Sequence, residues 1–382
     1  MRKNKVAFIA HPLNLSTLSV IMDIPKFFID WVGKNLVTKY LQEKKPFVFS
    51  RMNDLTSKTG DQIDFIAVAC PLLPEQMAML DSEFVLNRVI ESARVAKEDG
   101  ADIVTLGGFT SVVGNEGEEV ARAVDMAVTS GNTYTAALAI KGILRASEIV
   151  GLNLKKARCA VIGATGDIGS ACARFFADKV GSMAIAARNE TMLFKFSEEL
   201  SKKIGSTISI HKKTAEAVKD ADVIISATSA LTTIIDPESL KPGAIVCDVA
   251  LPANIAREVS RQRKDVLVFE GGLSSVPFYG KARNRKWDIL MPQNAVYGCL
   301  VEGLILGFEN KKENFSIGRG NISAEKIKQI SFLAVKHGFE LSEFFCGEKF
   351  YSSEDIQFLR NFIATKSNTQ TNVGTVQYAG KR

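Results

Sequence analysis

Cys299 is the first residue whose type and setting point to chemistry, because it is a thiol inside an apolar stretch, GCLVEGLILGFE. Its thiolate form is a strong nucleophile, whereas most free cysteines are small buried core residues. The same stretch carries Gly298, Gly303 and Gly307, each of which lowers helix propensity by up to about 1 kcal/mol. Something must therefore approach this helix closely, either a neighbouring helix or a ligand entering beside the thiol. The local sequence leaves both interpretations of Cys299 open.

The apolar pattern around Cys299 predicts a helix that begins near Pro292. In that helix the thiol lies about two turns from the N-terminus, beyond the first turn where the helix dipole acts strongly. We therefore expect any group that activates Cys299 to come from elsewhere in the fold.

A glycine-rich turn at mid-chain indicates a dinucleotide site. The run RCAVIGATGDIGSACARFF reads as a strand, a turn and a helix, with glycines at 163, 166 and 169. In such a turn the glycines allow a sharp bend, close approach of a pyrophosphate and tight packing of helix on strand. The expected contacts are the turn residues Gly163, Ala164, Thr165, Gly166, Asp167, Ile168 and Gly169.

The next predicted strand, residues 183–187, ends in Arg188 and Asn189 where NAD-binding proteins place an acidic residue. A carboxylate there would hold the ribose 2′-hydroxyl, whereas a guanidinium suits a 2′-phosphate. The sequence therefore predicts NADPH as the cofactor, with Asn189 assisting Arg188.

Alternating short strands and helices continue to about residue 272, which predicts a Rossmann-type, doubly wound parallel sheet in an α/β chain. Ser226, Thr228 and Asp248 follow predicted strands, at the edge where open α/β sheets bind ligands. We expect Thr228 and Asp248 to contact the cofactor, although small polar residues at strand ends also cap turns.

The rest of the chain surrounds this sheet. We expect four parts: a mixed α/β N-terminal substrate region over 1–154, the NADP(H) domain over 155–288, a helical C-terminal region with Cys299 over 289–345, and an extension over 346–382. Ser323 is a predicted helix cap. The polar end of the extension, from Thr365, is predicted to be a mobile tail.

Composition narrows the functional class. The chain has 382 residues with 46% hydrophobic and 24% charged residues, and a formal net charge of +6. It has neither an apolar run long enough to span a membrane nor a basic, aromatic-interleaved surface typical of nucleic-acid binding. Its six cysteines are widely spaced, without a metal-ligand pattern. We predict a cytoplasmic protein with no metal site.

Several motifs together resemble the long-chain acyl-(acyl carrier protein) reductases of cyanobacteria. In order along the chain they are LGGFTS, GNTYTA, VIGATGDIGSA, AARN, FEGG, GCLVEGLILGFE, NFSIGR and HGF. The resemblance runs from about His11 to Phe339 and is poor between about Ile24 and Leu80. It implies NADPH-dependent reduction of a long-chain acyl thioester to a fatty aldehyde, with Cys299 as the acyl-forming nucleophile.

The types and positions of polar residues in or near these motifs suggest further roles. His11, at the end of a predicted strand, is a candidate base or orienting group, or a structural histidine. Glu302 shares the helix face of Cys299 and is either a proton donor or a solvent-facing residue. Hydroxyl and amide groups in two turns suit a thioester oxygen or pantetheine amides, or they cap helices. These residues are Thr110, Ser111, Asn132, Thr133 and Thr135.

The implied partners are an acyl carrier protein or coenzyme A thioester and an enzyme that consumes the aldehyde. Two other functions stay open: a dehydrogenase of small hydroxy, keto or amino acids that works without a covalent intermediate, and a protein that senses NADPH without turnover.

Overall fold

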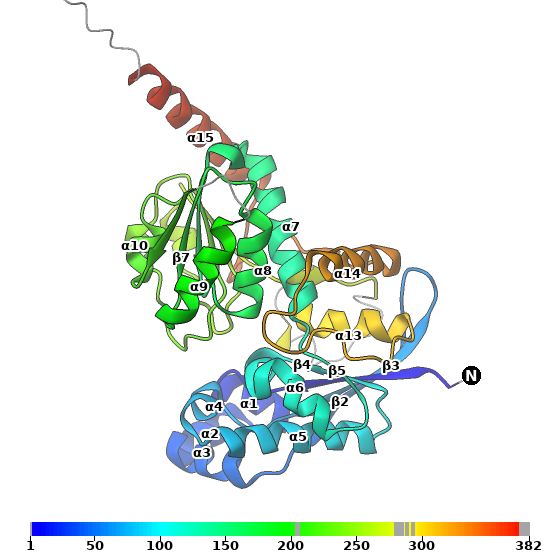
Figure 1. The fold of residues 1–382 in the computed structure, drawn as a ribbon. Coiled ribbons are helices and arrows are strands. Elements are labelled where there is room, and N and C mark those ends of the chain that lie inside the picture. The colour runs from blue at the N-terminus through cyan, green and yellow to red at the C-terminus, as the bar shows by residue number, and fades with distance from the viewer. Residues whose placement is uncertain (1, 203–206, 279–285, 287–289, 292–294, 374–382) are drawn as a thin grey trace, which may run out of the picture.

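The computed structural model describes residues 2–202, 207–278, 286, 290–291 and 295–373. It contains two large sheets, one in each half of the molecule, joined by a long helix (Figure 1). This arrangement confirms the predicted α/β fold with a parallel nucleotide-binding sheet.

The N-terminal sheet has the strand order β2-β3-β1-β4-β5, and only β2 runs antiparallel to its neighbour. Its strands are β1 (Asn4–Ala10), β2 (Phe47–Thr56), β3 (Gln62–Ala69), β4 (Ile103–Leu106) and β5 (Ala127–Thr129). Helices of the same half are α1 (Leu15–Met22), α2 (Lys26–Val32), α3 (Lys34–Glu43), α4 (Pro74–Met79), α5 (Ser82–Glu98) and α6 (Val113–Ala123).

Alternation along β1 shows how this sheet is buried on both faces. Ala7 and Ile9 pack in a cluster with α5, whereas Val6 and Phe8 pack on the opposite face. That second face is covered by α13 (Gly298–Phe308) and α14 (Ala324–His337). Because both faces are buried, the strands read as almost continuous apolar runs.

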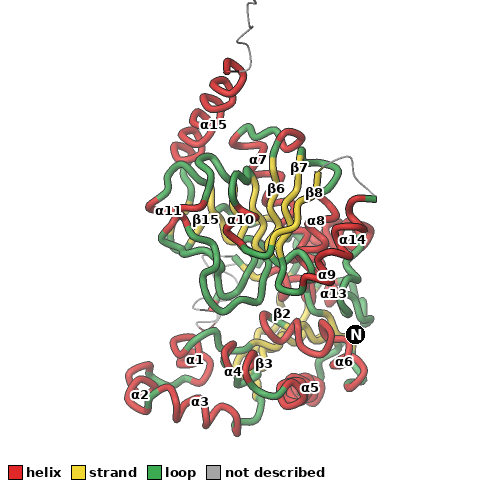
Figure 2. Tube along the Cα trace, turned by 60° about the vertical axis from the view of Figure 1, so that its left-hand side comes forward, coloured by secondary structure: helices red, strands yellow, loops and turns green. Residues whose placement is uncertain are grey.

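The second sheet is entirely parallel, with the order β11-β10-β9-β6-β7-β8. Its strands are β6 (Arg158–Ile162), β7 (Ser182–Ala186), β8 (Thr207–His211), β9 (Val223–Ser226), β10 (Ile245–Asp248) and β11 (Leu267–Glu270). Its helices include α8 (Asp167–Phe176), α9 (Glu190–Ser201), α10 (Thr214–Val218) and α11 (Val259–Gln262). Figure 2 shows these strands side by side, as the predicted doubly wound sheet requires.

Helix α7 (Asn132–Val150) connects the two halves (Figure 1). Tyr134 and Leu138 belong to the apolar cluster under the N-terminal sheet, whereas Ile143 and Val150 belong to the cluster under the second sheet. One continuous helix therefore contributes to both cores.

The region after the second sheet differs in part from its predicted form. Helix α13 begins at Gly298 and not near Pro292, because the chain just before it forms β13 (Val296–Tyr297). That strand pairs with β12 (Leu273–Ser275), which also pairs with β14 (Glu340–Leu341). Residues 292–294 lie outside the described part of the chain. The prediction that Cys299 lies deep inside its helix is therefore wrong.

Further along, Ser323 accepts a hydrogen bond from the Lys326 amide at 3.2 Å, so the predicted cap of α14 is confirmed. A short hairpin of β15 (Phe345–Cys346) and β16 (Lys349–Phe350) precedes α15 (Ser353–Val373). Helix α15 occupies the first part of the predicted mobile tail; residues 374–382 lie outside the described residues. The predicted domain boundaries stay a prediction.

None of the helices in the described ranges is long and apolar enough to cross a membrane.

Candidate active site

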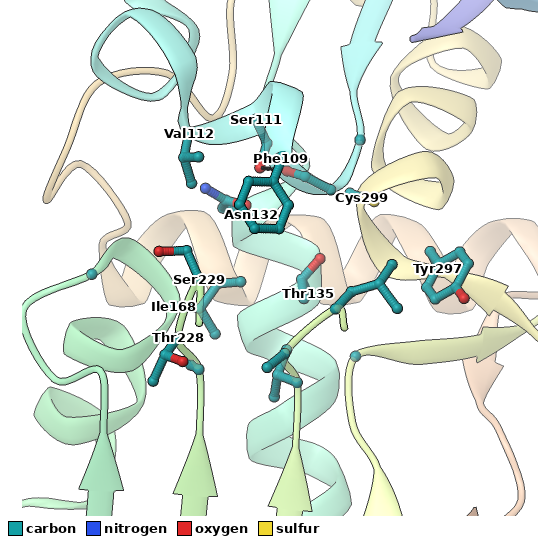
Figure 3. Close-up of a pocket in the computed structure, with 18 of the residues that line it drawn as sticks. Phe109, Ser111, Val112, Asn132, Thr135, Ile168, Thr228, Ser229, Tyr297 and Cys299 are labelled. Atoms are coloured by element: carbon teal, nitrogen blue, oxygen red, sulfur yellow. Dashed lines mark hydrogen bonds between the residues drawn. The ribbon is translucent and has the colours of Figure 1, made fainter. Parts of the chain in front are cut away.

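A cavity of about 720 Å³ lies where the carboxyl ends of strands from both sheets meet. Figure 3 shows Phe109, Ser111 and Asn132 near Cys299, with Ile168, Thr228 and Ser229 on the nucleotide side. The predicted residues that line it are His11, Ser111, Asn132, Thr135, Gly163, Thr165, Gly166, Asp167, Ile168, Arg188, Asn189, Thr228, Asp248 and Cys299. Thr110, Thr133, Ala164, Gly169 and Glu302 lie outside this lining.

Cys299 is the second residue of α13, directly beside the helix N-terminus. Burial raises the pKa of its thiol to about 11, while hydrogen bonds from the backbone of Gly108 and Leu300 act in the opposite direction. The helix dipole also favours a thiolate here. In the free protein the burial effect is the largest, so Cys299 is a thiol at neutral pH.

Gly131, the N-cap of α7, packs directly against the backbone of Cys299. A Cβ atom at Gly131 would lie 2.2 Å from the Cys299 Cα, and its φ of +73° also favours glycine. The N-termini of α7 and α13 therefore converge at Cys299. Their dipoles place positive potential where an anionic sulfur or oxygen would form.

His11 orients the loop beside Cys299. Its Nε2 accepts a hydrogen bond from the Phe109 amide at 3.0 Å, and its Nδ1 lies 3.2 Å from the Pro12 carbonyl oxygen. Burial lowers the pKa of His11 to about 4. The imidazole is thus neutral, with its accepting nitrogen already engaged, which favours an orienting role over that of a base.

Glu302 is completely buried and does not face solvent. It accepts hydrogen bonds from the Tyr134 amide at 2.7 Å and from the Thr129 hydroxyl. Burial raises the pKa of its carboxyl. Because Tyr134 is in the first turn of α7, Glu302 acts as a cap supplied by another helix.

The predicted hydroxyl and amide groups divide into two sets. Thr110 and Thr133 are fully buried; the Thr110 hydroxyl donates to the Gly107 carbonyl oxygen at 2.9 Å, and Thr133 bonds to Ser316. These two bonds are structural. Ser111, Asn132 and Thr135 instead line the cavity near Cys299 (Figure 3).

The glycine-rich turn fits a dinucleotide pyrophosphate. Gly163 has a φ of +82°, and a Cβ atom there would lie 2.2 Å from the Ala227 carbonyl oxygen. A Cβ atom at Gly169 would lie 2.2 Å from the Gly163 carbonyl oxygen, whereas the nearest atom to a Cβ at Gly166 is 3.4 Å away. Within the described part of the chain, the N-terminus of α8 has no side-chain cap. The backbone is therefore open to an anion at that helix end.

Arg188 lines the cavity just beyond β7, and its guanidinium donates to the Ser229 hydroxyl at 3.2 Å. Asn189 instead caps α9 by accepting from the Met192 amide at 3.0 Å. Lys212, which sequence reasoning missed, also lines this part of the cavity. It follows β8, the neighbour of β7 in the sheet, so the pairing of strand ends could have indicated it.

Thr228 and Asp248 meet at a residue that sequence reasoning missed, Asn254. The hydroxyls of Ser226 and Thr228 donate to the Asn254 Oδ1 at 2.9 and 2.6 Å. Asp248 accepts from the backbone amides of Asn254 and Ile255 at 2.6 and 3.0 Å. Burial raises the pKa of Asp248 to about 6. This network shapes the loop after β10.

A second missed group lies at another edge of the cavity. The guanidinium of Arg319, from the SIGR motif, forms an ion pair of 2.9 Å with the buried Glu116. Burial raises the pKa of both Glu116 and Asp167. Asp167 accepts from the Gly320 amide at 2.7 Å, so the loop around Arg319 joins both halves of the molecule.

Comparison with known proteins defines the class. The family model for shikimate / quinate 5-dehydrogenase matches residues 145–270, which contain the glycine-rich turn and most of the second sheet. Together with the open turn and its uncapped helix, this match makes the chain an oxidoreductase of the dehydrogenase and reductase type that uses a nicotinamide cofactor.

Two curated relatives cover most of the chain. A long-chain acyl-[acyl-carrier-protein] reductase from Synechococcus elongatus is 30% identical over 302 residues, which is 75% of this chain and 85% of that protein. Aminotransferase PigE from a Serratia species is 29% identical over 346 residues, which is 88% of this chain but only 39% of PigE. The chain belongs, as a distant member, to the long-chain acyl-[acyl-carrier-protein] reductase family.

Among solved structures, the chain is similar to L-tryptophan dehydrogenase from Nostoc punctiforme. The two sequences are 11% identical, the match covers 96% of this chain and 89% of that chain, and the TM-score is 0.40. Quinate dehydrogenase from Corynebacterium glutamicum also has 11% identity, over 87% of this chain and 99% of that chain, with a TM-score of 0.36.

Proposed function

We propose that the protein reduces a long-chain fatty acyl thioester to a fatty aldehyde through an acyl group carried on Cys299. The observation that supports this most strongly is the position of Cys299. The thiol lies at two converging helix N-termini, in one cavity with the dinucleotide turn.

In the first step the Cys299 sulfur attacks the carbonyl carbon of the thioester as a thiolate. A new carbon–sulfur bond forms, the bond to the carrier sulfur breaks, and the carrier leaves as a thiol with a proton that replaces the one Cys299 lost, so the transfer involves no net gain or loss of protons. The backbone groups of Gly108 and Leu300 stabilise negative charge on the Cys299 sulfur. His11 holds the loop that carries Gly108 and Phe109 in place.

The nicotinamide, when bound, supplies a hydride to the acyl carbon. Departure of the aldehyde returns Cys299 to its thiolate form. Of the charged groups on the nucleotide side, Arg188 and Lys212 suit a 2′-phosphate, which supports NADPH as the reductant.

An apolar arm of the cavity supports a long acyl chain as the substrate. It extends from Cys299 across the face of the N-terminal sheet that α13 covers and reaches α1. Its apolar lining includes Phe8, Ala10, Leu13, Ile21, Phe49, Phe65, Ala67 and Leu300. Each buried methylene contributes about 0.8 kcal/mol, so such an arm favours long chains over short ones.

We propose an acyl carrier protein or coenzyme A as the carrier and a separate enzyme as the consumer of the aldehyde. A free long-chain aldehyde is reactive and poorly soluble, which favours its rapid consumption.

Turnover assays test this function. NADPH consumption and aldehyde formation are measured with acyl carrier protein and coenzyme A thioesters of several chain lengths. We expect activity in the wild type and in Cys346→Ala, a matched cysteine outside the cavity lining, and none in Cys299→Ala. Equal turnover in both variants would instead indicate a dehydrogenase without covalent chemistry. NADPH binding without consumption of any thioester would indicate a sensing protein.

A further inference from the structure

The helix pair α2–α3 exposes an aromatic surface that the proposed reaction does not use. It consists of Phe27, Phe28 and Trp31 on α2, and Leu36 and Tyr40 on α3. Phe27 and Trp31 are 75% and 79% exposed, and the rings of Phe28 and Trp31 lie 5.8 Å apart. Soluble monomers rarely leave so many large apolar side chains together in water, and such patches mark interaction sites.

The exposure of this surface does not come from loose packing of the helices. Leu18, Ile29, Val37, Leu41 and Leu73 form a buried cluster that holds α1, α2 and α3 together. Figures 1 and 2 both place α2 and α3 at the outer end of the N-terminal half, remote from the nucleotide-binding sheet. The aromatic surface therefore projects outward from an ordered element.

The charges around this surface favour a lipid over a protein partner. Residues 23–45 contain five lysines and three acidic residues, and two of these lysines form ion pairs, Lys26 with Asp30 and Lys34 with Glu75. The Lys44 ammonium lies over the rings of Tyr40 and Phe47, 6.0 and 5.4 Å from their centroids. Lysine is depleted in protein–protein interfaces, whereas aromatic residues mixed with lysines are typical of helices at the surface of an anionic bilayer.

Helix α1 connects the helices of the aromatic surface to the apolar arm of the cavity. Thr17 and Ile21 of α1 line the cavity, and only residues 23–25 separate α1 from α2. We propose that α2–α3 seats the protein on an anionic lipid surface, with the apolar arm close to the acyl region of the bilayer. The benefit of this placement rests on the proposed function, since a long-chain aldehyde partitions into lipid. The docking itself does not depend on that function.

Flotation with lipid vesicles tests the docking without any thioester or cofactor. The vesicles are phosphatidylcholine alone, or phosphatidylcholine with about 30% phosphatidylglycerol. We expect the wild type to float with the anionic vesicles, and Phe27→Ser/Trp31→Ser to bind at least about tenfold more weakly. The matched control is Phe332→Ser/Val335→Ser on α14, whose residues are 72% and 57% exposed; it should bind like the wild type.

Two further measurements decide the outcome. Light scattering should give the same mass for the wild type and Phe27→Ser/Trp31→Ser, and both should turn over a short, soluble acyl thioester equally. Failure of the wild type to float with either vesicle type would overturn the proposal. It would also be overturned if the α14 control lost as much vesicle binding as Phe27→Ser/Trp31→Ser. A wild-type dimer that Phe27→Ser/Trp31→Ser dissociates would mean that a second copy covers this surface. If the wild type floats with the anionic vesicles but turns over no acyl thioester, only the proposed function is contradicted.

Discussion

The environment of Cys299 combines two opposing electrostatic effects. Burial disfavours the thiolate, whereas two helix N-termini and hydrogen bonds from the Gly108 and Leu300 backbone favour it. Since burial is the larger effect, the resting thiol is protonated and protected from unwanted oxidation. The positive helix ends then act when negative charge develops during attack.

The raised pKa predicts a distinct pH dependence of alkylation. The thiolate is the reactive form, so the rate of Cys299 modification by iodoacetamide should rise about tenfold per pH unit and continue rising above about pH 9. A simple thiol of ordinary pKa levels off near about pH 8.5 to 9. Peptide mapping of alkylated protein across this pH range gives the rate at Cys299. A rate that is already level at pH 7 would contradict the burial effect.

At this scale the sequence was informative about residue types and less so about their surroundings. The resemblance singled out Cys299, and the strand, turn and helix pattern singled out Gly163. Neither pattern could show that Val296 and Tyr297 form a strand, which moves the helix start to Gly298, because that strand exists only through pairing with β12. The link of Glu302 to α7 likewise depends on tertiary contact.

At the scale of elements, α13 illustrates why its glycines are needed. A Cβ atom at Gly303 would lie 1.8 Å from the Thr105 Oγ1, and one at Gly307 would lie 2.4 Å from Val6 Cγ2. At Gly303 and Gly307 the predicted close approach is therefore made by β4 and β1 of the N-terminal sheet, whereas at Gly298 it is made by the neighbouring helix α7, whose Thr135 Cα would lie 3.0 Å from a Cβ atom. The sequence showed that a partner was needed without identifying it.

This contact predicts that Gly303→Ala destabilises the protein by about 1 to 3 kcal/mol, because the methyl group overpacks against Thr105. In a Thr105→Ala background the same substitution should cost much less, since the obstructing hydroxyl is gone. Thr105 Oγ1 makes no hydrogen bond in the described structure, so its loss removes no bond. Urea unfolding of the four proteins in this cycle gives the coupling. An equal cost of Gly303→Ala in both backgrounds would contradict this packing.

At the scale of the whole molecule, α7 links the two halves mechanically. Glu302 of α13 caps the N-terminus of α7, and the two ends of α7 pack in different cores. The sequence predicted a helix here and a nucleotide-binding sheet after it, but not that one helix serves both cores. Periodicity identifies a buried helix face without identifying what covers it.

Because α7 is shared, we expect the two halves to unfold in one cooperative transition that NADPH shifts as a unit. At a concentration of about 100 Kd, NADPH should stabilise the protein by about 2.7 kcal/mol. In Arg188→Ala, a given concentration of NADPH should stabilise the protein against unfolding less than it stabilises the wild type. Stabilisation by NADH should be unchanged, since only NADPH carries the 2′-phosphate. Calorimetry that resolved two transitions, with NADPH moving only one of them, would contradict this coupling.

Intact-protein mass spectrometry shows whether Cys299 carries the acyl group. The protein is mixed with a long-chain acyl thioester in the absence of NADPH, with Cys299→Ala and Cys346→Ala in parallel. We expect one acyl adduct on the wild type and on Cys346→Ala and none on Cys299→Ala, and we expect the adduct to be released as aldehyde when NADPH is added. Absence of acylation in all three proteins with both carriers, while NADPH still binds, would show that Cys299 does not carry the acyl group.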